Sequence, residues 1–189
     1  MRISIAIMVL ATSLSLQSCS QQEDAPPPLP FALTEEAMGR YCGMNVLEHS
    51  GPKGQIILEN VPEAIWFSSA RDTLAFTMLP EEPRDIAAIY VSDMSKAASW
   101  EEPGAENWVD AREAVFVIDS ARRSGMGTEE AVPFSKDADA QAFAKLHGGR
   151  VVRFNDVPQD YVLGSGTSMP DAAPDSTGET EATEVDHHG

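Results

Sequence analysis

The sequence predicts an α+β domain built from two tandem β-β-α-β halves, a pseudo-duplication, with a disordered N-terminal tether and an acidic C-terminal tail. The first observation is an internal repeat, because residues 66–76 (WFSSARDTLAF) align at one fixed offset with residues 133–143 (PFSKDADAQAF). The second is that the same order of expected elements surrounds both segments. The third is the composition of the chain ends, which hold too little apolar surface to form a core.

The elements follow from local patterns. Apolar and alternating runs predict strands at 55–58, 64–67 and 86–91 in the first half and at 114–118, 131–134 and 151–154 in the second. Helices are expected at 70–79 and 137–146, where a proline and a glycine pair end them. We expect Ser68 or Ser69 to cap the first helix and Ser135 the second, with acidic residues in both first turns favoured by the helix dipole.

Burial can be predicted for parts of both halves. Residues 114–118 (AVFVI) are apolar throughout, which is typical of a central strand covered on both faces. Ala88 and Tyr90 should face one side of their strand, and Ile89 the other. Phe143 and Leu146 are expected to share one face of the second helix.

The first residues resemble a lipoprotein export signal. Residues 1–18 combine a positive charge with an apolar stretch that is too short to span a membrane. They end in Leu-Gln-Ser before Cys19, which resembles a bacterial lipobox in which Cys19 is lipidated and becomes the N-terminus. An ordinary cleaved signal with a chance cysteine is the alternative. Ser20 follows, and the lack of aspartate there favours an outer-membrane lipoprotein facing the periplasm.

Composition sets the remaining boundaries. Residues 19–39 are predicted to be the lipidated, proline-rich tether, and 165–189 a disordered acidic tail without lysine, arginine or aromatic residues. The two halves are expected at 40–110 and 111–164. The formal net charge is −17, which argues against nucleic acid as a partner because phosphate binding needs basic surface.

The most informative short motif is Cys42-Gly43-Met44. If Cys19 carries lipid, Cys42 has no disulfide partner, so it is a functional thiol, an intermolecular link, a metal ligand or a buried core residue. In an extended segment Cys42 and Met44 would point to the same side, and Gly43 could instead adopt a positive φ. A thiolate with a thioether is a soft donor set, which selects Cu(I) over hard divalent ions.

Further donors come from two other segments. Met126, between glycines in Ser-Gly-Met-Gly-Thr, is our candidate for a third ligand because an exposed loop offers it little packing. His49 either supplies a nitrogen or belongs to a turn. The alternative is a thiol-dependent enzyme or redox protein that uses Cys42 as nucleophile with His49 or His147 as base. No hydrolase elbow, phosphate-binding loop, zinc-protease motif or Cys-x-x-Cys is present.

The order of these motifs resembles the NosL family. A lipobox is followed by Cys42-Gly43-Met44, by Gly51-Pro52-Lys53-Gly54-Gln55, and by Gly125-Met126-Gly127 with Pro133-Phe134 nearby. The likeness covers most of residues 40–164. Cys-Gly-Met alone is short, and it is the order of the motifs that makes the resemblance specific.

This resemblance implies a copper-binding lipoprotein with two β-β-α-β halves rather than an enzyme. It also implies delivery of Cu(I) to the copper centres of nitrous oxide reductase, with an ABC-type maturation complex of the inner membrane as a further partner. Carried over to this sequence, Cys42 and Met44 are the paired ligands and Met126 is the third. The long acidic tail is not part of the family pattern and leaves room for a role in metal capture or docking.

Overall fold

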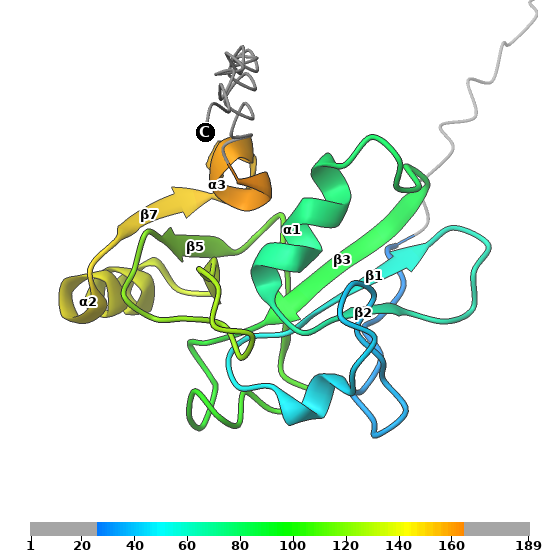
Figure 1. Cartoon of the computed structure of the whole chain (residues 1–189), viewed down its shortest axis with the longest axis horizontal. Helices are drawn as coiled ribbons and strands as arrows, with labels where there is room; N and C mark the ends of the chain where they lie inside the picture. Colours follow the sequence, from blue (N-terminus) through cyan, green and yellow to red (C-terminus); the bar gives the residue numbers. More distant parts are fainter. Residues whose placement is uncertain (1–25, 165–189) are drawn as a thin grey trace, which may run out of the picture.

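The computed structural model describes residues 26–164, which form a mixed α/β domain with two antiparallel sheets (Figure 1). The first half contains β1 (Gly54–Leu58), β2 (Ile65–Phe67), α1 (Ala70–Met78), β3 (Ile86–Ser92) and β4 (Trp108–Asp110), preceded by the 3₁₀ turn η1 (Val46–Glu48). Its strand order is β2-β1-β3-β4. The short edge strand β4 was not expected from the sequence.

The second half repeats this order of elements. It contains β5 (Val115–Ile118), β6 (Val132–Phe134), α2 (Asp137–His147) and β7 (Arg150–Arg153), followed by η2 (Phe154–Asp156) and α3 (Gln159–Leu163). Its strand order is β6-β5-β7. The first strand of this half, β5, therefore lies between the other two, just as β1 lies between β2 and β3. All predicted strands and both predicted helices occur, each bound within one residue of the expectation. A common origin of the two halves stays a prediction.

One apolar core joins the two sheets. Residues of α1 such as Leu74 and Phe76 pack with β1 and β3 on one side and with Phe116 and Ile118 of β5 on the other. The alternate residues of β5 face α2, where Val117 lies in a second cluster. The expectation of a fully buried central strand is therefore confirmed, and α1 occupies the middle of the molecule (Figure 1).

Two expectations for α2 are wrong. Leu146 is 77% exposed and does not share the buried face of Phe143, which packs against the second cluster. Ser135 does not cap α2, because Lys136 is the N-cap residue and makes no side-chain cap hydrogen bond. Instead, the Ser135 N–H donates to Asp93 Oδ1 at 2.9 Å and the Lys136 N–H donates to Ser95 Oγ at 3.2 Å. By contrast, Ser69 caps α1 as expected.

These contacts belong to a reciprocal arrangement of buried carboxyl groups. Asp93, from the end of β3, accepts hydrogen bonds at the start of α2. Glu130, from the segment before β6, accepts the Arg71 N–H in the first turn of α1 at 2.9 Å. The Arg71 N–H is in the first turn of α1 and has no intrahelical partner, whereas the Ser135 N–H lies just before α2. Each half thus accepts a hydrogen bond from a donor of the other. The two halves are therefore linked by buried hydrogen bonds in both directions.

The chain enters the domain earlier than the sequence suggested. The carbonyl of Pro28 accepts the Tyr90 hydroxyl at 2.8 Å, and both backbone groups of Phe31 bond the Gln55 side chain at 2.9 Å. Leu33 is buried. Within the segment 19–39, the residues from 28 onward thus bind the domain instead of spacing it from a membrane. The predicted signal, Cys19 and the acidic tail lie outside the described residues, and no helix within 26–164 is long and apolar enough to cross a membrane.

Candidate metal centre

Cys42 lies in a tight turn between Gly39 and Met44. The Gly39 N–H donates to the Met44 carbonyl at 2.9 Å, and the Gly43 N–H donates to the Gly39 carbonyl at 2.8 Å. Gly43 has a φ of 64°, a left-handed conformation that glycine adopts without steric cost. Of the two conformations that the sequence left open, the segment thus adopts the one with a positive φ at Gly43, and the chain folds back between Cys42 and Met44.

The half-buried thiol sits in a narrow slot between Gly39 and Ser68. Its Sγ lies 3.1 Å from the Ser68 hydroxyl oxygen, and Ser68 itself is buried. A Cβ added at Gly39 would lie 2.5 Å from Cys42 Sγ and 2.8 Å from Ser68 Oγ. A hydroxyl at this distance can donate to the sulfur when the thiol is ionised, and such charge-assisted hydrogen bonds are the stronger ones.

Sequence reasoning missed this role of Ser68. The only available signal was the pair of adjacent serines before α1, because a single serine suffices for the cap. Ser69 provides that cap by accepting the Asp72 N–H. Ser68 is not needed for the cap, and its hydroxyl contacts the Cys42 thiol.

The Cys42 turn is fixed to the first half by its other residues. The Arg40 N–H donates to the Trp66 carbonyl at 2.7 Å, and the Tyr41 ring lies 5.6 Å from that of Phe67. Both the Arg40 guanidinium and the Tyr41 hydroxyl bond the carboxylate of Glu82, each at 3.1 Å. Burial, and then the charge of Glu82, raise the pKa of Tyr41, so its hydroxyl stays a donor. These contacts therefore hold the loop that carries the Cys42 thiol against the first half.

Both candidate methionine ligands are accessible. Met44 is 38% exposed and Met126 is 43% exposed. Met126 lies at the tip of a hairpin that two backbone hydrogen bonds close. The Ser124 N–H donates to the Thr128 carbonyl, and the Gly127 N–H donates to the Ser124 carbonyl, each at 2.9 Å. By contrast, Met78 and Met94 pack against the two main clusters, as expected for core methionines.

The Met126 hairpin rests on His49. A Cβ at Gly125 would lie 2.7 Å from both His49 Cβ and the Ser50 backbone nitrogen, so the two backbones approach closely. His49 follows η1, and its Nε2 is buried without a hydrogen-bond partner among the described residues. A nitrogen in that state is compatible with a ligand role as well as with simple packing.

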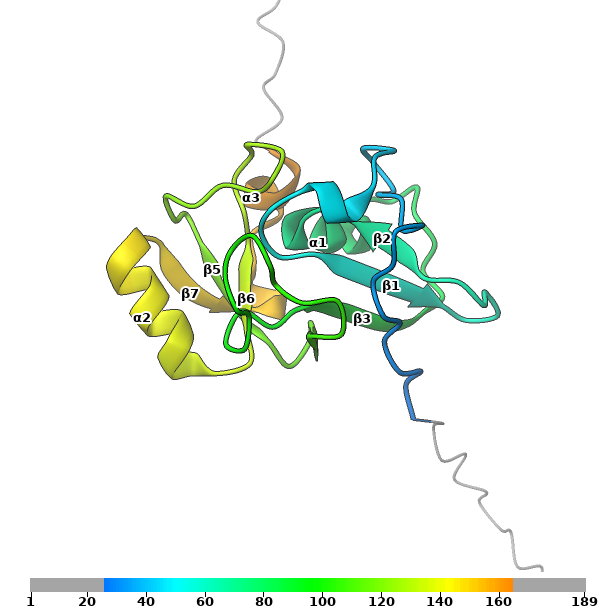
Figure 2. The same cartoon turned by 90° about the horizontal axis from the view of Figure 1, so that it is seen from below.

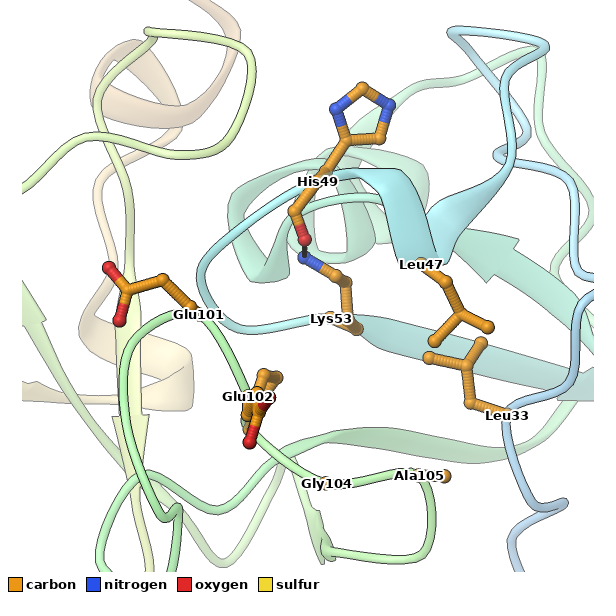
Figure 3. A pocket seen from close by; sticks show the side chains of 9 residues that line it. Leu33, Leu47, His49, Lys53, Glu101, Glu102, Gly104 and Ala105 are labelled. Carbon is orange, nitrogen blue, oxygen red and sulfur yellow. Dashed lines mark hydrogen bonds between the residues drawn. The ribbon is translucent and has the colours of Figure 1, made fainter.

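Lys53 holds the segment that carries His49. Its side chain is 2% exposed, and its ammonium donates to the carbonyls of His49, Ser50 and Gly51. Burial lowers the pKa of Lys53 to about 8. A cavity of about 270 Å³ adjoins this lysine, and the His49 imidazole points away from it (Figure 3). The lysine therefore shapes the backbone beneath His49.

The candidate residues lie along one edge of the domain. In Figure 2 the segment from 39 to 49 and the loop between β5 and β6 occupy the upper edge of the domain, opposite to the blue start of the coloured ribbon. Cys42 and Met44 belong to one hydrogen-bonded turn. His49 lies against the backbone of the Met126 hairpin. Between residues 26 and 164, no group of three or more histidine, cysteine or acidic side chains is arranged to hold a metal. Besides Cys42 and His49, the candidate donors at this edge are the thioethers of Met44 and Met126.

The contacts of Cys42 do not favour the nucleophile hypothesis. Within the described residues, the hydrogen-bond partners of Sγ are the Ser68 hydroxyl and, at 3.9 Å, the Met44 carbonyl. An activated cysteine needs a base within reach, and neither group is one. The other candidate base, His147, packs its ring 4.5 Å from that of Phe143 in α2.

Comparison with known proteins places the chain in a family. Residues 30–162 match the family model NosL. The chain is 43% identical over 164 residues to the copper-binding lipoprotein NosL of Achromobacter cycloclastes, covering 86% of this chain and 85% of that protein. It is 30% identical over 154 residues to the protein of the same name from Stutzerimonas stutzeri, covering 81% and 79%.

A solved structure has the same fold. The crystal structure of the copper chaperone NosL from Shewanella denitrificans is 34% identical, superposes with a TM-score of 0.66, and is matched over 71% of this chain and 98% of that one. The family match covers more than half of the chain and both sheets. On this evidence the chain belongs to the NosL family.

Proposed function

We propose that this protein is a Cu(I)-binding metallochaperone, not an enzyme, which holds one copper ion with Cys42, Met44 and Met126. The observation that carries the proposal is the Cys42 turn, in which a thiol is held against Ser68 while the neighbouring thioether stays exposed. Soft sulfur donors select monovalent copper. The relatives named as copper-binding proteins and as a copper chaperone support the choice of metal.

Transfer of copper is the function that such a site supports best. Few ligands, two of them exposed thioethers, allow an acceptor ligand to bind before a donor ligand leaves. Binding releases the thiol proton, so apparent affinity should fall as the pH decreases. His49 is an additional nitrogen donor in this scheme, because its Nε2 has no other partner within the described residues.

We further propose that nitrous oxide reductase is the acceptor and that an ABC-type complex of the inner membrane takes part in its maturation. Lipidation at Cys19 would anchor the protein in the outer membrane, facing the periplasm, and the relatives named as lipoproteins support an anchor. The edge that carries the candidate ligands is opposite to the blue start of the coloured ribbon (Figure 2), from which the anchored segment would lead to the membrane. This orientation leaves the metal accessible to a partner.

The test is an anaerobic competition titration with a Cu(I) chelator. Cys42→Ser should lose most of the Cu(I) affinity, and Met126→Ile should weaken it measurably, because each removes one sulfur donor. Met94→Ile is the matched control, since that methionine packs against the second cluster and the change nearly preserves volume. Unchanged affinity in Cys42→Ser would reject the site.

A further inference from the structure

Glu130 is a buried carboxyl group that the proposed copper site does not use directly. It is 1% exposed, and its Oε1 accepts the N–H groups of Arg71 and Ala131, each at 2.9 Å. Its Oε2 is buried and has no partner among residues 26–164. Burying a carboxyl oxygen without a hydrogen bond costs free energy, so a structural or functional role for this group is worth seeking.

The position of Glu130 in the chain suggests that task. It directly follows the hairpin 123–129, whose ends are joined by a bridge between Arg123 and Glu129. The Glu130 carbonyl also accepts the Tyr161 hydroxyl at 2.9 Å, and Arg71 Nε donates to the Tyr161 carbonyl at 3.1 Å. The base of the Met126 hairpin is thereby fixed to α1 and α3.

The same end of α1 supports the thiol. Ser68 and Ser69 immediately precede the helix, and Ser68 contacts Cys42 Sγ. The residue that Glu130 bonds, Arg71, is in the first turn of that helix. The thiol and the Met126 hairpin therefore come from different halves of the chain but share one support.

We propose that Glu130 is a positioning residue, which locks the Met126 hairpin to the start of α1 so that the thioether of Met126 is held in range of the copper bound by Cys42. This inference rests on the proposed function. Groups that position metal ligands from outside the coordination sphere affect affinity strongly, and their loss typically costs about tenfold to a hundredfold.

The electrostatic surroundings are consistent with a carboxyl group kept for its hydrogen bonds. Burial, helped by the charge of Asp72, raises the pKa of Glu130 to about 8 against the opposing effects of the bonded N–H groups and of Lys53. A neutral acid at this position still accepts both N–H donors. Glu130→Gln should therefore keep both hydrogen bonds through its amide oxygen, whereas Glu130→Ala should lose them.

The experiment is a double-mutant cycle measured by Cu(I) competition. Glu130→Ala should weaken Cu(I) binding by about tenfold to a hundredfold when Met126 is present and should add little when Met126→Ile has already removed the thioether. Glu130→Gln should keep the affinity of the native protein, because its amide oxygen can accept the same bonds. Tyr161→Phe, a milder change, should show the same dependence on Met126 and serves if Glu130→Ala does not fold.

The matched control is Asp93→Ala. This carboxyl group is equally buried and ties the halves together at α2 instead of α1, so its loss should lower stability without changing Cu(I) affinity. An equal loss of affinity from Glu130→Ala with and without Met126, or no loss in a folded variant, would overturn the inference. If Cys42→Ser keeps its affinity, the proposed function fails as well. If Cys42→Ser loses it while the cycle is additive, only the role of Glu130 is refuted.

Discussion

Replacing Gly39 by alanine should damage the candidate copper site by a purely steric route. The added Cβ would lie 2.5 Å from Cys42 Sγ, whereas ordinary contacts begin near 3.4 Å, so the sulfur must retreat by about 1 Å. The φ of Gly39 is not positive, so alanine brings no backbone strain of its own. The same Cβ would also approach Ser68 Oγ to 2.8 Å, so the two groups that bond each other are pushed apart.

The size of the effect follows from the contact that is lost. A hydrogen bond to a charged group such as a thiolate is worth about 1.5–3 kcal/mol. Since about 1.4 kcal/mol is a factor of ten, Gly39→Ala should weaken Cu(I) binding by about tenfold to a hundredfold. The overpacked slot should also lower the free energy of unfolding by about 1–3 kcal/mol.

The measurement pairs the Cu(I) titration with urea unfolding of the purified protein. Gly148→Ala is the control, because its φ of 75° gives backbone strain while a Cβ there would meet no atom within 4 Å. That variant should lose about 1–2 kcal/mol of stability and none of its copper affinity. If Gly39→Ala folds and binds Cu(I) as tightly as the native protein, the slot around the thiol does not determine affinity.

Two further predictions concern the serine pair and the buried acid. Ser68→Ala should weaken Cu(I) binding with little change in stability, whereas Ser69→Ala should cost about 1 kcal/mol of unfolding free energy by removing the α1 cap. Equal effects of the two changes on copper would contradict the assignment of the thiol contact to Ser68. Burial raises the pKa of Glu130 from 4.5 to about 8, so the folded state keeps a proton that the unfolded state has lost between these values. Stability from this group is full below pH 4.5 and declines as the pH rises to about 8, so the advantage of Glu130→Gln in urea unfolding should grow across that interval. A difference that stays constant with pH would show that Glu130 titrates normally.

The sequence alone determined the local structure and the chemistry of the donors. Periodicity located the three strands and the helix of each β-β-α-β half, because alternation and apolar runs reflect burial directly, but it missed the short elements β4 and α3. Cys42 and Met44 could be identified as soft donors from residue type alone. Membership of the NosL family followed from the order of the short motifs and agrees with the family match.

The tertiary structure decided what surrounds those donors. Ser135 looked like a helix cap, but a carboxyl group from the other half, Asp93, accepts its N–H instead. Ser68 contacts the thiol, and Glu130 bonds the start of α1 across 59 positions of sequence. Such contacts depend on which segments the packed sheets bring together. Local patterns specify a residue's own conformation and burial, whereas the partner of a buried polar group is fixed only when the two halves pack.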